Sequence, residues 1–149
     1  MSIQRIVRGI LAGGFGACLT VAGLSILPCG VASAHSNEYL MTISGPHGGM
    51  VRMAEAHHFE VVAKNGELQV WATDHGGTPQ STAGASASAT ILTGKSKVSV
   101  KLAPQGENEL AAKDVKIKVG PHSKIVLAVT MKGESPLLVR YAIDEQKAH

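Results

Sequence analysis

Metal-ligand side chains are concentrated in one glycine-rich stretch of this chain, residues 45–59, GPHGGMVRMAEAHHF. The stretch holds three of the seven histidines and two of the five methionines: His47, His57, His58, Met50 and Met53. A further histidine, His75, lies in DHGG at residues 74–77, which repeats the His-Gly-Gly of residues 47–49. Imidazole nitrogen and thioether sulfur bind copper, and imidazole also binds zinc and nickel. These residue types therefore indicate a transition-metal site.

A predicted β-hairpin brings two of these histidines together. Asn65-Gly66 between two apolar runs is typical of a two-residue type I′ turn. The resulting register gives one continuous apolar face, made by the pairs Phe59–Ala72, Val61–Val70 and Ala63–Leu68. On the other face, His58 becomes a diagonal neighbour of His75, about 7–8 Å away at the backbone. The hairpin therefore places two imidazoles within reach of one ion.

We predict that His47, His58 and His75 bind this ion and that Met50 adds a thioether. Met50 and Met53 are three residues apart, so they point to opposite faces of a regular strand, and one of them should fill the core. Met50 is the predicted ligand because it follows a glycine turn. His57 shares the apolar face and lies opposite Asp74, which favours a structural hydrogen bond. Whether His57 and Met53 add ligands stays open.

Residues 1–34 have the features of a cleaved secretory signal peptide. A charged start and an apolar region over residues 10–27 precede Ala32-Ser33-Ala34, the small-residue pattern of a cleavage site. A membrane anchor is the alternative, because the apolar region is nearly long enough to span a bilayer. Its glycines and its Ala-Ser-Ala end favour cleavage. We therefore expect an exported, periplasmic protein whose mature form has no membrane segment.

Cleavage after Ala34 would change the available chemistry. Cys18 and Cys29 would be removed, which leaves no disulfide and no thiolate ligand. His35 would become the first residue, where its amino group and imidazole could chelate Cu(II) together, although a mobile chain end is the simpler interpretation. Twelve Lys and Arg would then oppose eleven Asp and Glu, and no basic run indicates nucleic-acid binding.

The remaining chain has the pattern of an all-β domain. Short segments rich in Val, Ile, Leu and Thr alternate with Gly, Pro, Asn and Lys. The expected strands are Tyr39–Ser44, Met50–Ala54, His57–Ala63, Leu68–Thr73, Ala85–Leu92, Lys97–Leu102, Val115–Val119, Lys124–Met131 and Leu137–Ile143. This pattern predicts one domain over residues 35–145, a small antiparallel β-sandwich of immunoglobulin-like type with about seven to nine short strands. Residues 146–149 are expected to be a disordered tail.

Motifs of catalysis do not stand out in the sequence. No serine, histidine and acid have a familiar spacing, no phosphate-binding glycine loop precedes a helix, and no carboxylates form an obvious pair. We therefore expect a binding protein and not an enzyme. A copper enzyme built on His35 is the catalytic alternative.

Several short motifs resemble those of one protein family. They are HGG at 47–49, HFEVV at 58–62, L-x-V-W-x-x-D at 68–74, GGTP at 76–79 and GASASA at 84–89. The chain from His47 to Ile143 is similar to small periplasmic heavy-metal-binding domains that occur alone or as amino-terminal extensions of the periplasmic adaptor proteins of RND-type heavy-metal efflux pumps. In that pattern His47 and His58 match histidines, whereas His57 stands where an aromatic residue is more frequent. The resemblance implies metal handling beside an efflux system.

The sequence thus leads to two competing functions. The first is a periplasmic protein that buffers a transition-metal ion or delivers it to an efflux adaptor, with copper or silver favoured and zinc, nickel and cobalt as alternatives. The second is a metal-free immunoglobulin-like module with a structural or interaction role in the cell envelope.

Overall fold

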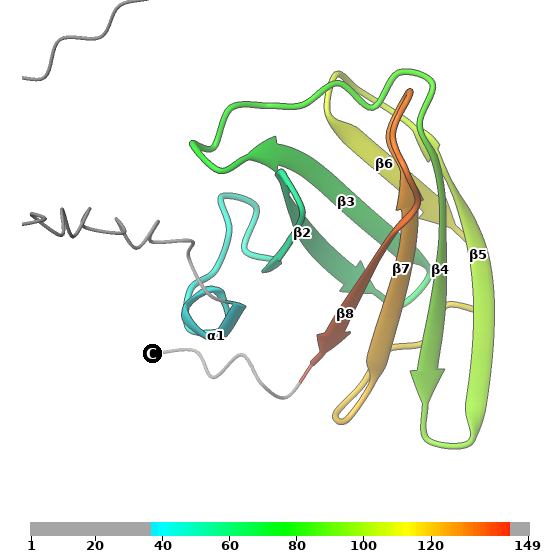
Figure 1. Ribbon diagram of the computed structural model, residues 1–149. Helices are drawn as coiled ribbons and strands as arrows, with labels where there is room; N and C mark the ends of the chain where they lie inside the picture. The colour runs from blue at the N-terminus through cyan, green and yellow to red at the C-terminus, as the bar shows by residue number, and fades with distance from the viewer. Residues whose placement is uncertain (1–36, 144–149) are drawn as a thin grey trace, which may run out of the picture. The chain divides into compact units, whose positions relative to one another are not determined.

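The computed structural model describes residues 37–143, which form one short helix and eight strands (Figure 1). The elements are α1 (Asn37–Leu40), β1 (Met50–Ala54), β2 (His57–Lys64), β3 (Glu67–Asp74), β4 (Ser86–Thr93), β5 (Ser96–Pro104), β6 (Glu109–Lys113), β7 (Lys124–Thr130) and β8 (Leu137–Ala142). The expected signal peptide, its cleavage site, His35 and the tail at 146–149 lie outside the described residues. Within residues 37–143, no helix has the length and apolarity needed to cross a membrane.

All eight strands belong to one antiparallel sheet in the order β1-β2-β3-β6-β5-β4-β7-β8. β5 pairs with β4 along most of its length but with β6 only at Ala103 and Pro104. The sheet curls so that its first and last strands, β1 and β8, come together and form a nearly closed barrel (Figure 1). The all-β expectation is confirmed, but the two-sheet immunoglobulin-like sandwich is wrong, because the two halves are joined through β5 into one sheet.

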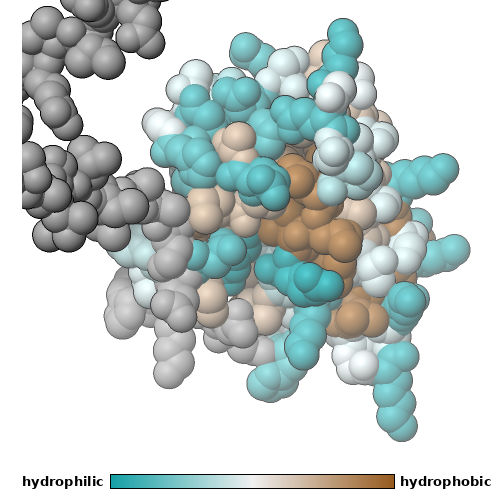
Figure 2. All heavy atoms as spheres, in the orientation of Figure 1, coloured by the Kyte–Doolittle hydropathy of each residue, from teal (hydrophilic) through white to brown (hydrophobic). Residues whose placement is uncertain are grey.

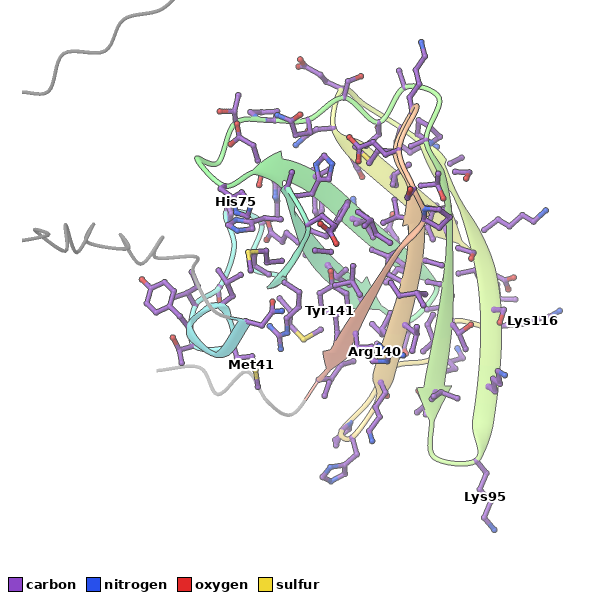
Figure 3. All side chains as sticks on the ribbon, in the orientation of Figure 1. Met41, His75, Lys95, Lys116, Arg140 and Tyr141 are labelled. Carbon is purple, nitrogen blue, oxygen red and sulfur yellow. The ribbon has the colours of Figure 1, made fainter. Side chains whose placement is uncertain are left out.

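A buried tyrosine bridges the place where the barrel closes. The Tyr141 hydroxyl on β8 donates a hydrogen bond of 3.0 Å to the carbonyl of Phe59 on β2. The guanidinium carbon of Arg52 on β1 lies 5.8 Å from the centre of the Tyr141 ring. Figure 3 shows Tyr141 between β8 and the β2 side of the sheet. These contacts fasten β8 across the seam to the first two strands.

The core fills the interior of the barrel with alternate residues of the strands. The largest fully buried apolar side chains are Phe59, Val61, Leu68, Val70, Ile91, Leu110, Ile117, Ile125, Leu127 and Val129. In Figure 2 hydrophobic residues gather in the middle of the visible face, over β7 and β8, and hydrophilic residues surround them. Burial of this apolar surface is the main favourable term in folding.

The β2–β3 hairpin has the predicted register but a different turn. Lys64 faces Glu67, and the pairing continues to His57 and Asp74, as expected. Gly66 has a positive φ of 87°, whereas Asn65 does not, so the type I′ turn, which needs positive φ at both positions, is wrong. The turn is fastened to the loop before β7, since the Asn65 side chain accepts a hydrogen bond of 3.0 Å from the Val119 N–H.

Two segments that were predicted to be strands have other conformations in the structure, and one observed strand was not predicted. Residues 39–44 form the end of α1 and a turn, and residues 115–119 form a loop. In that loop Ile117 is buried while Val115 is 84% exposed, so the alternation of apolar residues is not that of a strand. The missed strand, β6, has the sequence ELAAK, whose residues have low β-propensity. Its pairing with β3 stabilises this segment as a strand despite its composition.

Candidate metal-binding site

The outer face of β1, β2 and β3 carries the candidate ligands. Successive residues of a strand point to opposite faces. Every second residue of β2 points inward, so His58 and Glu60 lie on the outer face. The observed registers align two rows across the three strands, Met53–His58–Thr73 and Val51–Glu60–Trp71. His75 follows directly after β3, on the same side as Thr73.

His58 and His75 meet at the end of the hairpin, as the sequence predicts. The Nε2 atom of His58 lies 3.2 Å from the Nδ1 atom of His75, and the two rings stand nearly perpendicular with centres 5.0 Å apart. His58 is half-buried and His75 is exposed at the margin of the sheet, where Figure 3 shows it beyond the end of β3. Solvent can therefore reach the nitrogen pair.

The other nitrogen of His75 fixes the protonation of its ring. Nε2 lies 3.1 Å from the carbonyl oxygen of Glu55, and a carbonyl only accepts hydrogen bonds, so Nε2 carries the proton. In the neutral ring Nδ1 then keeps its lone pair and faces His58. Histidines that bind metals commonly donate their second N–H to a backbone carbonyl in this way. Glu55 itself has a positive φ of 52°, a conformation uncommon for residues other than glycine.

Asp74 shapes the turn that carries His75. Its Oδ1 atom accepts hydrogen bonds of 2.8 Å from the backbone N–H groups of Gly76 and Thr78. These bonds, that from Thr78 above all, lower the pKa of the Asp74 carboxyl below its usual value. The turn is therefore held by a carboxylate that is charged at neutral pH, and His75 also contributes to the lowered pKa.

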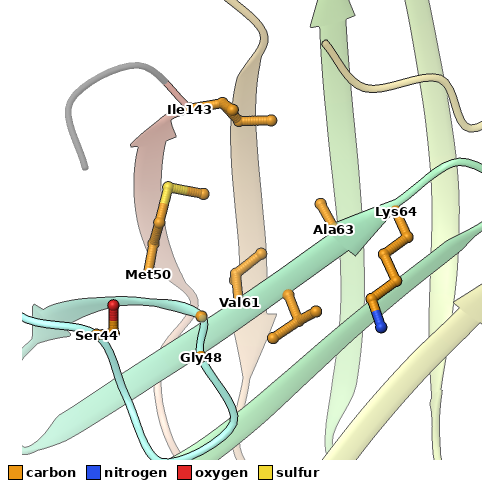
Figure 4. Close-up of a pocket in the computed structure, with 9 residues that line it drawn as sticks. Ser44, Gly48, Met50, Val61, Ala63, Lys64 and Ile143 are labelled. Atoms are coloured by element: carbon orange, nitrogen blue, oxygen red, sulfur yellow. The ribbon is translucent and has the colours of Figure 1, made fainter. Parts of the chain in front are cut away.

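Met50 lies away from this pair, on the inner side of the sheet. It pairs with the buried Val61, is 8% exposed and belongs to the hydrophobic core. Its side chain lines a pocket of about 410 Å³ together with Ile143, as Figure 4 shows. The two methionines of M-x-x-M do point to opposite faces, and Met53 is the one that shares the outer face with His58.

His47 has its own partners on the outer face. Its Nδ1 atom lies 2.8 Å from Oε2 of the buried Glu60, and its ring stacks on Trp71 with centres 3.9 Å apart. Oε1 of the same glutamate accepts hydrogen bonds of 2.8 Å from the backbone N–H groups of His47 and Gly49. One carboxylate thus fastens the whole loop to β2.

Two glycines of this loop, Gly45 and Gly49, allow close packing. A Cβ atom at Gly45 would lie 2.3 Å from the Glu60 carboxyl carbon, and one at Gly49 would lie 2.5 Å from the Val61 carbonyl oxygen. Both approaches are too close for any side chain. Close packing therefore explains Gly49 of the His-Gly-Gly motif, whereas Gly48 has nothing within 4 Å and has a positive φ of 77°, which favours glycine.

His57 is a structural histidine, as its position in the predicted register suggests. It is 6% exposed and points to the inner side beside Phe59, with ring centres 5.7 Å apart. Its Nε2 atom lies 2.8 Å from Oε2 of Glu134 in the loop before β8. Within the described part of the chain, its buried Nδ1 atom has no hydrogen-bond partner.

The predicted ligands thus separate into one pair and two single residues. Across residues 37–143, no three His, Cys, Asp or Glu side chains come together in a group that could hold a metal ion. His58 and His75 form the pair, whereas His47 is bound to Glu60 and Met50 is in the core. The sequence analysis left the role of Met53 open, and the register of β1 against β2 now aligns this residue with His58.

Comparison of the chain with protein-family models, with curated proteins and with solved structures gives no match.

Proposed function

We propose that this protein binds a transition-metal ion reversibly through His58 and His75 at the outer face of β2 and β3. The observation that carries the proposal is the 3.2 Å separation of the His58 Nε2 and His75 Nδ1 atoms. Two imidazole nitrogens bound to one tetrahedral ion at about 2.0–2.1 Å are about 3.3–3.4 Å apart. An ion could therefore replace the hydrogen bond between the rings with little movement of the backbone, when His58 takes the tautomer that carries its proton on Nδ1 and leaves the Nε2 lone pair for the ion.

The position of the pair suits exchange of the ion with another protein. His75 is exposed, and two imidazoles leave coordination positions open for water or for ligands of a partner. We propose accordingly that the protein buffers metal in the periplasm or delivers it to the adaptor of a heavy-metal efflux pump. This role rests on the resemblance of the sequence motifs and on the expected signal peptide.

Titration with Zn(II) tests the proposal, because zinc has no redox chemistry. In calorimetry at pH 7.5, His58→Ala and His75→Ala should each weaken binding by about ten- to a thousand-fold, or about 1.4–4 kcal/mol. His122→Ala is the matched control, since this histidine belongs to the loop before β7, and its affinity should equal that of the wild type. Affinity should also fall in acid, because an imidazole must be unprotonated to bind a metal ion.

A metal-free module is the second candidate, and one observation favours it. His75 already has partners at both ring nitrogens, namely His58 and the Glu55 carbonyl, so the cluster is satisfied without an ion. Absence of Zn(II), Cu(I) and Ag(I) binding by the wild-type protein would support this candidate and reject the metal-binding proposal.

A further inference from the structure

Met53 stands directly across from His58 on the outer face of the sheet. The two residues are paired in the register of β1 and β2, so their side chains project to the same side. Met53 is half-buried and is absent from the hydrophobic core that includes Met50. A thioether therefore lies in the same row as one imidazole of the pair, outside the hydrophobic core.

The backbone bonds of Met53 show how close this pair is. Its N–H donates to the side-chain oxygen of Asn37 at 2.8 Å, and its carbonyl accepts from the side-chain nitrogen of Asn37 at 3.4 Å. Both groups therefore point away from β2, which makes Met53–His58 a pair without mutual hydrogen bonds. In such pairs the Cα atoms are only about 4.5 Å apart and the side chains are closer than in hydrogen-bonded pairs.

The long methionine side chain can span the remaining distance to the nitrogen pair. Methionine has three rotatable bonds and a polarizable sulfur, so it adapts to irregular sites. Because Met53 and His75 flank His58 on the same outer face, the sulfur can approach an ion that the two imidazoles hold. His58 is then the central ligand of the three.

We infer that Met53 is the third ligand of the proposed site and that its cargo is a soft monovalent cation, Cu(I) or Ag(I). The inference rests on the proposed function of His58 and His75. Two imidazoles and one neutral thioether make an uncharged donor set, and thioether sulfur selects soft Cu(I) over harder divalent ions. Zn(II) can use the two imidazoles and water, so loss of the sulfur affects it little.

Parallel titrations with Ag(I) and Zn(II) test this inference, because silver is a redox-stable probe for the Cu(I) type of ion. Met53→Leu should weaken Ag(I) binding by about ten- to a hundred-fold and change Zn(II) binding by less than about threefold. Met50→Leu is the matched control, a volume-conserving change in the core that should leave both affinities unchanged. Equal Ag(I) affinity of Met53→Leu and the wild type would overturn the inference.

A second measurement avoids substitution at the site. In wild-type protein with ¹³C-labelled methionine methyl groups, one equivalent of Ag(I) should shift the Met53 methyl resonance and leave that of Met50 in place. An unshifted Met53 signal in a protein that binds Ag(I) and Zn(II) would reject the third ligand alone. Failure of the wild type to bind either ion would reject both the inference and the proposed function.

Discussion

His57 and His58 are neighbours in β2, yet they have opposite surroundings. His57 points inward, is 6% exposed and bonds to Glu134, whereas His58 points outward and meets His75. Met50 and Met53 differ in the same way, one in the core and one on the outer face. A shift of one position in a strand thus separates residues that hold the fold from residues that can bind a ligand.

This comparison predicts different consequences for changes on the two faces. Inner-face substitutions should lower the free energy of unfolding and leave metal affinity unchanged in whatever protein stays folded. Outer-face substitutions at the histidine pair should weaken metal affinity and leave the free energy of unfolding nearly unchanged.

The largest effect is expected at the centre of the inner face. Phe59 is fully buried, so Phe59→Ala should lower the free energy of unfolding by about 3–5 kcal/mol, because it removes an aromatic ring and leaves a cavity. His58→Ala, one residue away, should change it by no more than about 0.5 kcal/mol without metal. Urea denaturation with a chelator measures both. If His58→Ala lowered the free energy of unfolding as much as Phe59→Ala, the predicted difference between the two faces would be wrong.

A smaller loss of stability is expected when the buried His57 is replaced by alanine. His57→Ala removes a ring packed beside Phe59 and its bond to Glu134, and should lower the free energy of unfolding by about 1–3 kcal/mol. The Zn(II) affinity of the folded variant should equal that of the wild type. A tenfold weaker affinity would mean that His57 contributes to the metal site and not only to the fold.

Replacing the tyrosine at the seam should lower the free energy of unfolding modestly, and this difference from the wild type should shrink at high pH. Tyr141→Phe removes one buried hydrogen bond to Phe59, worth about 0.5–1.5 kcal/mol. Burial raises the pKa of Tyr141 above its ordinary value of 10.0, so the unfolded chain ionises first. The stability of the wild type should therefore begin to fall as pH rises through about 10, and that of Tyr141→Phe should fall less steeply. Denaturation at pH 8 and pH 11 compares the two, and identical slopes would contradict this account.

The smallest effect is expected at the turn that carries His75. Asp74→Asn keeps an oxygen acceptor for the N–H groups of Gly76 and Thr78, whereas Asp74→Ala removes it. Asp74→Ala should weaken Zn(II) binding by less than the tenfold expected for a lost ligand, and Asp74→Asn should weaken it even less. Calorimetry of both variants tests this order, and an equal loss of affinity in both would show that the carboxylate charge matters more than the turn.

The lowered pKa of Asp74 adds a dependence on acid. Because this pKa is lower in the folded state, the carboxylate stabilises the fold above the ordinary value of 3.8, and this contribution is lost as pH falls further. Asp74→Asn should remove that part of the acid dependence. Thermal unfolding between pH 3 and pH 6 measures it.

The sequence alone determined the features that depend on local alternation. The hairpin register, with His57 opposite Asp74 and His58 beside His75, follows from the apolar face of residues 59–72. The opposite orientation of Met50 and Met53 follows from the two-residue period of a strand. These patterns need only neighbouring residues, so they can be read along the chain.

Only the tertiary structure decided the features that depend on distant partners. Closure into a barrel instead of a sandwich involves Tyr141 and Phe59, which are 82 residues apart. β6 is a strand because β3 lies beside it, although its own residues do not favour one. The buried carboxylate of Glu60 holds His47, and the register of β1 selects Met53 instead of Met50 as the neighbour of His58. In each case a contact between separate segments determines the outcome, and hydrophobic alternation within one segment contains no information about it.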